Sequence, residues 1–341
     1  MTGKNIRYYR LMKAMSQEKL AQAVGVGKMA ISNYESGKRT PDYDTFRKIA
    51  KALDVSLAKL LANSSEDLVI EHGAFRKHAA ISKSQQEVIL GKADRYLGRL
   101  LEAVSFVGDP ALPSIPDFEQ TEVNDVEEAG RYLRSILGLP ASGPIGNITD
   151  ILENQGFIIC PVDYDGRGFS GNSGKVNGRP YIAINTAMPA ERQRFTLIHE
   201  LAHLVFKFNS EQNEERMVDG IAGAFLLPRP DILRELGPKR TDIRWDLRNI
   251  RREYRISMAA IVMRAYQANI INKEVYETTM KWMSKNGLRT DEQSDMLPDK
   301  THQLEQLVSR AVLEEEIGIS KAAELLELPL TETRRLCYGE V

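Results

Sequence analysis

Residues 195–206 read Phe-Thr-Leu-Ile-His-Glu-Leu-Ala-His-Leu-Val-Phe and contain the pattern His199-Glu200-Leu201-Ala202-His203. Positions i and i+4 share one face of a helix, so both imidazoles can reach a single metal ion. Glu200 can project to the open side of that ion and accept a proton from bound water. The apolar residues on both sides of the motif are typical of a buried helix.

A chance match to this motif is disfavoured. The chain holds 5 histidines in 341 residues, and two of them stand in this one turn. A random chain of this composition would show the pattern at about the 0.5% level. The sequence therefore predicts a zinc site at His199 and His203.

A catalytic zinc takes three protein ligands and a water molecule, so a third ligand should follow downstream. Glu211, Glu214 and Glu215 are the candidates. We favour Glu215, because Asp219 lies four residues later on the same helical face and could orient a ligand histidine through its second ring nitrogen. Glu214 is the second choice, and both glutamates could instead be ordinary residues at the favourable end of a helix dipole.

These residues resemble the ImmA/IrrE family of zinc metallopeptidases. The likeness covers residues 121–230 and rests on two runs, Arg192-Gln-Arg-Phe-Thr-Leu-Ile-His-Glu-Leu-Ala-His203 and Glu215-Arg-Met-Val-Asp-Gly-Ile-Ala-Gly-Ala-Phe-Leu-Leu-Pro228. It implies a minimal thermolysin-like zincin fold that cleaves transcriptional repressors. Zinc would be bound by His199, His203 and Glu215, and Glu200 would be the general base. The chain has Ala202 where the family usually has Gly and Ile221 where it usually has Phe, but every ligand position is kept.

This resemblance suggests a reaction scheme. Zinc would polarise the scissile carbonyl and acidify its bound water, and Glu200 would pass the proton to the leaving amine. We expect Tyr181–Asn185 to be an edge strand that pairs with an extended substrate. The sequence does not identify the residue that stabilises the oxyanion.

A second motif lies near the N-terminus and predicts a helix–turn–helix. It reads Ser16-Gln-Glu-Lys-Leu-Ala-Gln-Ala-Val-Gly-Val-Gly-Lys-Met-Ala-Ile-Ser-Asn-Tyr-Glu-Ser-Gly-Lys-Arg39. Gly25 can adopt a positive φ and end the first helix. The predicted N-caps of this region are Ser16, Asp44 and Ser56.

The second helix of this motif should present its outer face to DNA. Side chains expected at base edges in the major groove are Lys28, Met29, Ser32 and Asn33. Side chains expected at phosphates are Gln17, Ser36, Lys38 and Arg39. The motif resembles the XRE (Cro/C1-type) helix–turn–helix family over residues 4–61, which implies a five-helix lambda-repressor-like domain that binds operator DNA. Gly27 replaces the usual Ser or Thr cap, at a cost of a few tenths of a kcal/mol.

Charge distribution supports DNA over the alternative of a helical bundle used for dimerisation or protein binding. The chain has a net charge of −1, but residues 1–65 hold 12 Lys and Arg against 5 Asp and Glu, a net charge of +7. The remainder therefore carries −8. A basic domain on an acidic body suits phosphate neutralisation. The dyad symmetry common to such DNA sites favours a homodimer.

Composition excludes several protein classes. With 42% hydrophobic and 27% charged residues, the chain is neither disordered nor collagen-like. No stretch approaches the ~20 apolar residues of a membrane span, and the start lacks a secretory signal. Cys160 and Cys337 are expected to be reduced thiols. We therefore predict a cytoplasmic protein without membrane contact.

The predicted fold is mainly α with an α+β centre. We expect a DNA-binding domain (1–65), a connector with one long helix at 84–107 (66–120), a metallopeptidase domain (121–230) and a helical C-terminal region (231–341). The central domain should contain strands 157–162 and 181–185, joined by a glycine-rich segment at 166–178, and helices 126–137, 145–154, 190–206 and 214–227. The C-terminal helices could serve packing or oligomerisation, or else further DNA contact or partner sensing. His72, His78 and His302 are interpreted as surface or core residues.

Two functions remain in competition. The first is a DNA-binding zinc endopeptidase that cleaves a protein such as a repressor or toxin partner in trans, or its own 66–120 connector in cis. The second is a non-proteolytic transcriptional repressor or antitoxin whose zincin-like domain senses a ligand or partner. A complete His199, Glu200, His203 and Glu215 set favours the first.

Overall fold

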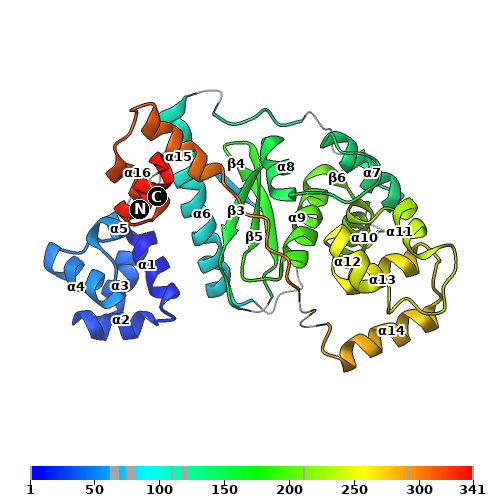
Figure 1. Cartoon of the computed structure of the whole chain (residues 1–341). Helices are drawn as coiled ribbons and strands as arrows, with labels where there is room; N and C mark the ends of the chain where they lie inside the picture. The colour runs from blue at the N-terminus through cyan, green and yellow to red at the C-terminus, as the bar shows by residue number, and fades with distance from the viewer. Residues whose placement is uncertain are drawn as a thin grey trace.

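The computed structural model describes residues 2–61, 69–73, 81–108, 111–116, 121–166, 168–209, 212–289, 292 and 294–339. Over these residues the chain is mainly helical, with a small mixed sheet at its centre and a separate helical lobe at the N-terminal end (Figure 1). The predicted fold class, mainly α with an α+β centre, is confirmed. None of the described helices is both long and apolar enough to cross a membrane.

The N-terminal lobe contains five helices around one small core. They are α1 (Thr2–Met12), α2 (Gln17–Val24), α3 (Lys28–Glu35), α4 (Tyr43–Leu53) and α5 (Leu57–Leu61). Ser16 caps α2 by accepting a hydrogen bond from the Lys19 amide, and Gly25 ends it with φ 79°, both as predicted. Asp42, not Asp44, caps α4, because Asp42 has the extended backbone of a cap and accepts from the Thr45 amide.

A buried ion pair ties α1 to the helix–turn–helix. The Arg10 guanidinium donates to both carboxylate oxygens of Glu35, at 2.5 and 2.9 Å. It also donates to the Met15 carbonyl at 2.7 Å. The pairing is bidentate and shielded from solvent, so it fixes the end of α3 against the first helix.

The central sheet has the strand order β1-β4-β5-β3. Its strands are β1 (Ile70–His72), β3 (Ile158–Val162), β4 (Gly171–Val176) and β5 (Arg179–Asn185). β3 is parallel to β5, and β4 is antiparallel to both β5 and β1. The prediction that Tyr181–Asn185 is an edge strand is therefore wrong, because β3 and β4 pair with its two sides. A second, two-stranded sheet pairs β2 (Thr121–Glu122) with β6 (Phe206–Lys207).

The glycine-rich segment 166–178, for which the sequence predicts no strand, contains β4. Its glycines are required by close contacts: a Cβ on Gly171 would lie 2.6 Å from Thr196 Cγ2, and one on Gly174 would lie 2.2 Å from the Glu71 carbonyl oxygen. Glycine normally weakens a strand, so local sequence gave no strand signal here.

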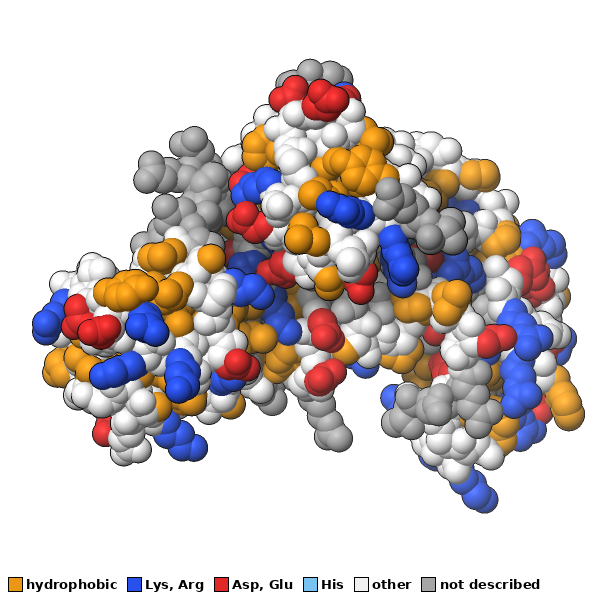
Figure 2. Space-filling model, turned by 60° about the vertical axis from the view of Figure 1, so that its left-hand side comes forward, with side chains coloured by type: hydrophobic (Ala, Val, Ile, Leu, Met, Phe, Trp, Pro, Cys, Tyr) orange, Lys and Arg blue, Asp and Glu red, His pale blue; other side chains and the backbone are white. Residues whose placement is uncertain are grey.

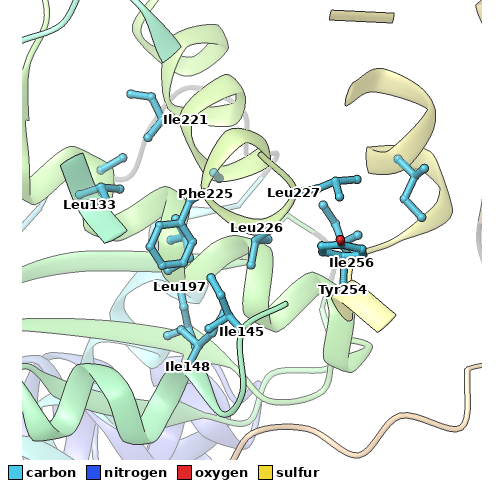
Figure 3. Close-up of a cluster of buried hydrophobic side chains, with 14 of the residues drawn as sticks. Leu133, Ile145, Ile148, Leu197, Ile221, Phe225, Leu226, Leu227, Tyr254 and Ile256 are labelled. Atoms are coloured by element: carbon cyan, nitrogen blue, oxygen red, sulfur yellow. The ribbon is translucent and has the colours of Figure 1, made fainter. Parts of the chain in front are cut away.

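Helices cover both faces of the sheet (Figure 1). One face packs against α6 (Lys83–Val107), which is joined by α15 (Gln303–Leu313), α16 (Ile319–Leu326) and α17 (Leu330–Tyr338). The other packs against α9 (Ala190–Val205), whose larger core also takes in α7 (Val126–Ile136), α8 (Ile148–Asn154), α10 (Glu214–Leu226), α11 (Arg229–Leu236), α12 (Leu247–Tyr254), α13 (Met258–Gln267) and α14 (Lys273–Lys285). Figure 3 shows Leu197 of α9 beside Phe225 of α10 in this core. Residues 231–341 thus contribute to two cores.

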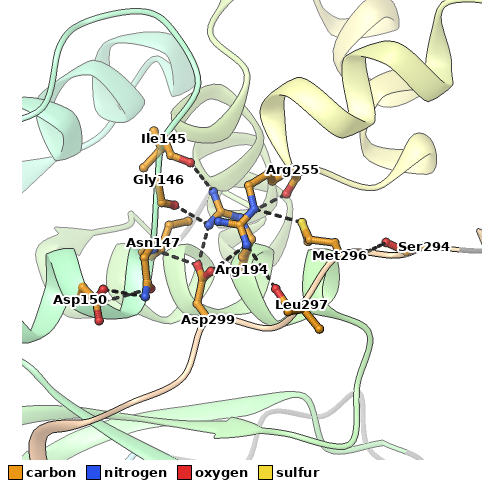
Figure 4. A network of polar contacts seen from close by, with 11 residues as sticks. Ile145, Gly146, Asn147, Asp150, Arg194, Arg255, Ser294, Met296, Leu297 and Asp299 are labelled. Atoms are coloured by element: carbon orange, nitrogen blue, oxygen red, sulfur yellow. Dashed lines mark hydrogen bonds and ion pairs between the residues drawn. The ribbon is translucent and has the colours of Figure 1, made fainter.

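Arg194 anchors α9 to the segments around it (Figure 4). Its fully buried guanidinium donates to the Ile145 and Gly146 carbonyls at 2.9 and 2.6 Å, and to the Asp299 carboxylate at 2.5 Å. α8 begins at Ile148 rather than at the predicted Ile145, because Asn147 caps it by accepting a hydrogen bond from the Asp150 amide. Burying such a charge is tolerated when its donors have partners, and a fourth hydrogen bond, to the Arg255 carbonyl at 3.2 Å, adds to these contacts.

The cysteines are internal, and the visible surface carries mixed charge. Cys160 and Cys337 are both buried and unbridged. Charged side chains of both signs are scattered among neutral and hydrophobic ones on the face shown in Figure 2.

The buried carboxyl of Glu153 on α8 should make stability pH-dependent. Burial raises its pKa from 4.5 to about 7, against the opposing effect of the hydrogen bond donated by Thr301. The unfolded chain then releases this proton at lower pH than the folded one, so the free energy of unfolding falls as pH rises from 4.5 to 7. In urea unfolding experiments, the free energy of unfolding of wild type should fall by about 2 to 3 kcal/mol more between pH 5 and pH 8 than that of Glu153→Gln. Equal losses would contradict the assignment.

Candidate metal centre and DNA-binding surface

Two adjacent helices bring the predicted metal ligands together. α9 carries His199 and His203, one turn apart, and α10 carries Glu215 beside them. The Nε2 atoms of the two histidines are 3.2 Å apart. Glu215 places its carboxylate oxygens 3.5 Å from His199 Nε2 and 3.9 Å from His203 Nε2. One ligand atom from each of the three residues lies within 4.8 Å of the others.

These separations fit a shared metal ion. Two nitrogens bound to a tetrahedral zinc at about 2.0–2.1 Å would lie about 3.3 Å apart, close to the 3.2 Å between the Nε2 atoms. Two imidazoles and one carboxylate are also a common protein donor set of catalytic zinc. The residues present therefore form a possible metal site.

The other ring nitrogen of each histidine meets a carboxylate. Asp219 Oδ1 lies 2.9 Å from His199 Nδ1, as expected from its place one turn after Glu215. Glu214 Oε1 lies 3.1 Å from His203 Nδ1, on the side of the ring away from Glu215. The hydrogen bond between Asp219 and His199 would fix that ring and make its opposite nitrogen a better ligand. Glu214 lies within ion-pair distance of the His203 ring nitrogen that faces away from Glu215, while Glu211 falls outside the described residues.

The surroundings of His199 favour a positive charge. Burial lowers the pKa of its ring, but the hydrogen bond with Asp219 and the charges of Glu200 and Glu215 outweigh burial, and the pKa is raised. A proton or a metal cation would be stabilised here for the same electrostatic reason.

Glu200 is held by a residue that the sequence analysis missed. Ser173 on β4 donates its hydroxyl to Glu200 Oε2 at 2.9 Å. A Cβ on Gly171 would lie 3.3 Å from Glu200 Cγ, so β4 packs directly over this carboxylate. No local signal marks Ser173, because it stands in the glycine-rich segment for which the sequence predicts no strand.

The predicted DNA-contacting residues gather around α3. Lys28, Lys38 and Arg39 are exposed, and the Met29 side chain is 73% exposed. Ser32 and Asn33, on the same helix, are half-buried. α3 starts at Gly27 without a side-chain cap, as the sequence indicated.

Two predicted phosphate contacts have partners within the protein. Gln17 donates its amide to Glu35 Oε2 at 2.8 Å, so the buried Arg10–Glu35 pair also positions the start of α2. Ser36 donates its hydroxyl to the Asn33 carbonyl at 3.3 Å.

Two segments of the chain match known families. Residues 6–60 match the family described as helix-turn-helix, and residues 161–266 match a peptidase family described as IrrE N-terminal-like domain. The chain fuses an XRE-type helix–turn–helix to an IrrE-like domain. The predicted resemblance to both families is therefore confirmed.

The curated proteins that this chain matches align with only about a fifth of it. An uncharacterized HTH-type transcriptional regulator, YqaE of Bacillus subtilis, is 36% identical over 22% of the chain and 64% of its own length. The cryptic phage CTXphi transcriptional repressor RstR of Vibrio cholerae is 34% identical over 20% of the chain and 61% of its own length. The chain thus spans less than two thirds of either relative.

A search of solved structures adds little. PlcR of Bacillus thuringiensis, in complex with the peptide PapR7 and DNA, aligns over 99% of both chains at 12% identity. Its TM-score is 0.18, which is too low to support any structural conclusion.

The zinc affinities of glutamine variants should distinguish the roles of Glu215 and Glu214. We expect Glu215→Gln to weaken zinc binding more than about 100-fold, because it removes a ligand. Glu214→Gln should weaken it only about tenfold, because it removes a contact to a ligand. Competition titration with a chromophoric chelator measures both, with circular dichroism to check folding. A larger loss in Glu214→Gln than in Glu215→Gln would overturn this assignment.

Proposed function

We propose that this chain is a DNA-binding transcriptional regulator with zinc-dependent endopeptidase activity. The observation that supports it most is the convergence of His199, His203 and Glu215 beside a glutamate, Glu200, that is held by Ser173. A purely structural metal site needs no such general base, since structural zinc is usually closed by four protein ligands.

Each residue has a distinct part in the proposed reaction. A zinc ion held by His199, His203 and Glu215 would polarise the scissile carbonyl and acidify its bound water. Glu200 accepts the proton of the attacking water and delivers it to the leaving amine. Asp219 keeps the His199 ring oriented, and the Ser173 hydroxyl keeps the Glu200 carboxylate in place.

The DNA-binding role rests on the helix–turn–helix and its charge. The family match covers residues 6–60, and the first 65 residues carry a net charge of +7. The relatives described as transcriptional regulators support an operator-binding role for this part of the chain. We propose a homodimer on DNA, and as substrate a repressor or toxin partner in trans, or the chain's own connector in cis.

A comparison of Glu200→Gln with wild type tests the activity. We expect zinc-loaded wild type to create new protein N-termini in a host lysate, and Glu200→Gln to bind zinc normally but cut about 10²–10⁴-fold more slowly. Glu277→Gln, the same change at an exposed position on α14, should cut like wild type. Mass-spectrometric mapping of N-termini gives the readout.

Two results would contradict this proposal. Full cleavage by Glu200→Gln would exclude Glu200 as the general base. The absence of new termini with zinc-loaded wild type would favour the non-proteolytic repressor or antitoxin.

A further inference from the structure

A short segment of the chain itself covers the outer edge of the sheet. Residues Val69–Gly73, which lie between the DNA-binding lobe and α6 in the sequence, include strand β1. β1 runs antiparallel to β4, with Ile70 opposite Val176 and His72 opposite Gly174. The backbone amide of Asn177 donates to the Val69 carbonyl at 2.8 Å, and the backbone amide of Gly73 donates to the Ser173 carbonyl at 2.8 Å.

This edge is the one next to the proposed general base. Ser173 takes part in both contacts: its carbonyl accepts from Gly73, and its hydroxyl donates to Glu200. β5 is closed on both sides by other strands, so β4 presents the sheet edge beside Glu200. An extended peptide that reached Glu200 by pairing with the sheet would use the backbone groups that β1 now uses.

The direction of β1 also suits a peptide that approaches the site. Its N-terminal end, at Val69, lies opposite Asn177, and its C-terminal end, at Gly73, lies opposite Ser173. The segment therefore runs toward Glu200. A peptide that pairs with β4 in the same direction as β1 would place its C-terminal end beside the Glu200 carboxylate.

Close contacts restrict which residues a strand paired with β4 can have. A Cβ on Gly73 would lie 2.3 Å from the Ser173 carbonyl oxygen, so a glycine is required at that position. The Asn172 side-chain amide donates to the Gly73 carbonyl at 3.1 Å. One residue earlier, His72 Nδ1 lies 2.7 Å from the Tyr181 hydroxyl and Nε2 lies 3.0 Å from Asp94 of α6.

β1 is nevertheless weakly buried. Its three residues are half-buried or exposed, whereas four of the five residues of β3 and six of the seven of β5 are buried. Segments with few buried contacts open at lower free energy than the core of a sheet. β1 can therefore leave β4 without loss of the strands that carry the site.

We propose that Val69–Gly73 is an internal occupant of a peptide-binding edge on β4 and must leave before a peptide substrate can reach Glu200. The partner for this edge is an extended peptide strand with glycine opposite Ser173. The inference rests on the proposed endopeptidase function, and it makes the chain autoinhibited until β1 is displaced.

Gly73→Val tests this occupancy, because its side chain cannot fit against the Ser173 carbonyl. The matched control is Gly318→Val, at a glycine where a Cβ would meet nothing within 4 Å. The probe is a fluorescent synthetic peptide with the sequence of residues 66–76, Glu-Asp-Leu-Val-Ile-Glu-His-Gly-Ala-Phe-Arg. Both variants are made in full-length Glu200→Gln protein so that the peptide is not cut.

Fluorescence anisotropy gives the decisive comparison. If β1 occupies the edge at least nine-tenths of the time, its release tightens apparent peptide binding by about tenfold or more. We expect this gain in Gly73→Val and no gain in Gly318→Val. Equal binding by Gly73→Val and its parent would overturn the proposal.

A second variant, Glu71→Pro, tests the same proposal in case Gly73→Val does not fold. Glu71 stands opposite Lys175, midway between the hydrogen-bonded positions Val69 and Gly73. In the alternating antiparallel pattern its backbone amide therefore faces the Lys175 carbonyl. Glu71→Pro removes that donor and should give the same gain in binding. If neither variant gained affinity while both kept the wild-type circular dichroism spectrum, the proposal would be wrong.

Cleavage of denatured casein by the zinc-loaded protein with Glu200 intact separates this inference from the proposed function. Faster cleavage in Gly73→Val than in wild type supports both. Tighter peptide binding without cleavage in any variant keeps the occupied edge and rejects the peptidase. Equal cleavage by wild type and Gly73→Val, together with equal peptide binding by the Glu200→Gln parent and its Gly73→Val variant, rejects the occupied edge alone.

Discussion

The packing of α9 against α10 is the contact on which the candidate site depends. Buried residues of both helices, among them Leu197, Leu201, Val218 and Phe225, share one core. This contact sets the distance between the two imidazoles on α9 and the carboxylate on α10. A core that close-packs transmits small displacements, so a cavity beneath Phe225 would move Glu215 relative to His199.

Buried polar contacts add to the apolar packing that positions these helices. Arg194, five residues before His199, fixes the α9 helix to the 145–146 backbone and to Asp299. In the N-terminal lobe, Arg10 and Glu35 do the same for the helix–turn–helix. In both places a buried arginine satisfies several acceptors at once, which makes the geometry specific rather than merely compact.

The features with local signals were predictable from the sequence. The i, i+4 histidines, the Ser16 cap and the Gly25 helix end depend only on neighbouring residues, and all lie where the sequence placed them. The sheet was not predictable to the same degree. β1 pairs with residues about 100 positions away, and the glycines of β4 are needed because Thr196 and Glu71 approach its backbone. Ser173 was missed for the same reason, since its contact with Glu200 exists only once β4 is paired.

Anomalous diffraction from zinc-soaked or zinc-cocrystallised crystals, measured on both sides of the zinc edge, shows whether α9 and α10 hold a zinc ion. The account predicts one anomalous peak within about 2.0–2.2 Å of His199 Nε2, His203 Nε2 and a Glu215 oxygen. Glu200 should remain bound to Ser173 and outside the coordination sphere. A peak coordinated by Glu214, or the absence of any peak between α9 and α10, would contradict it.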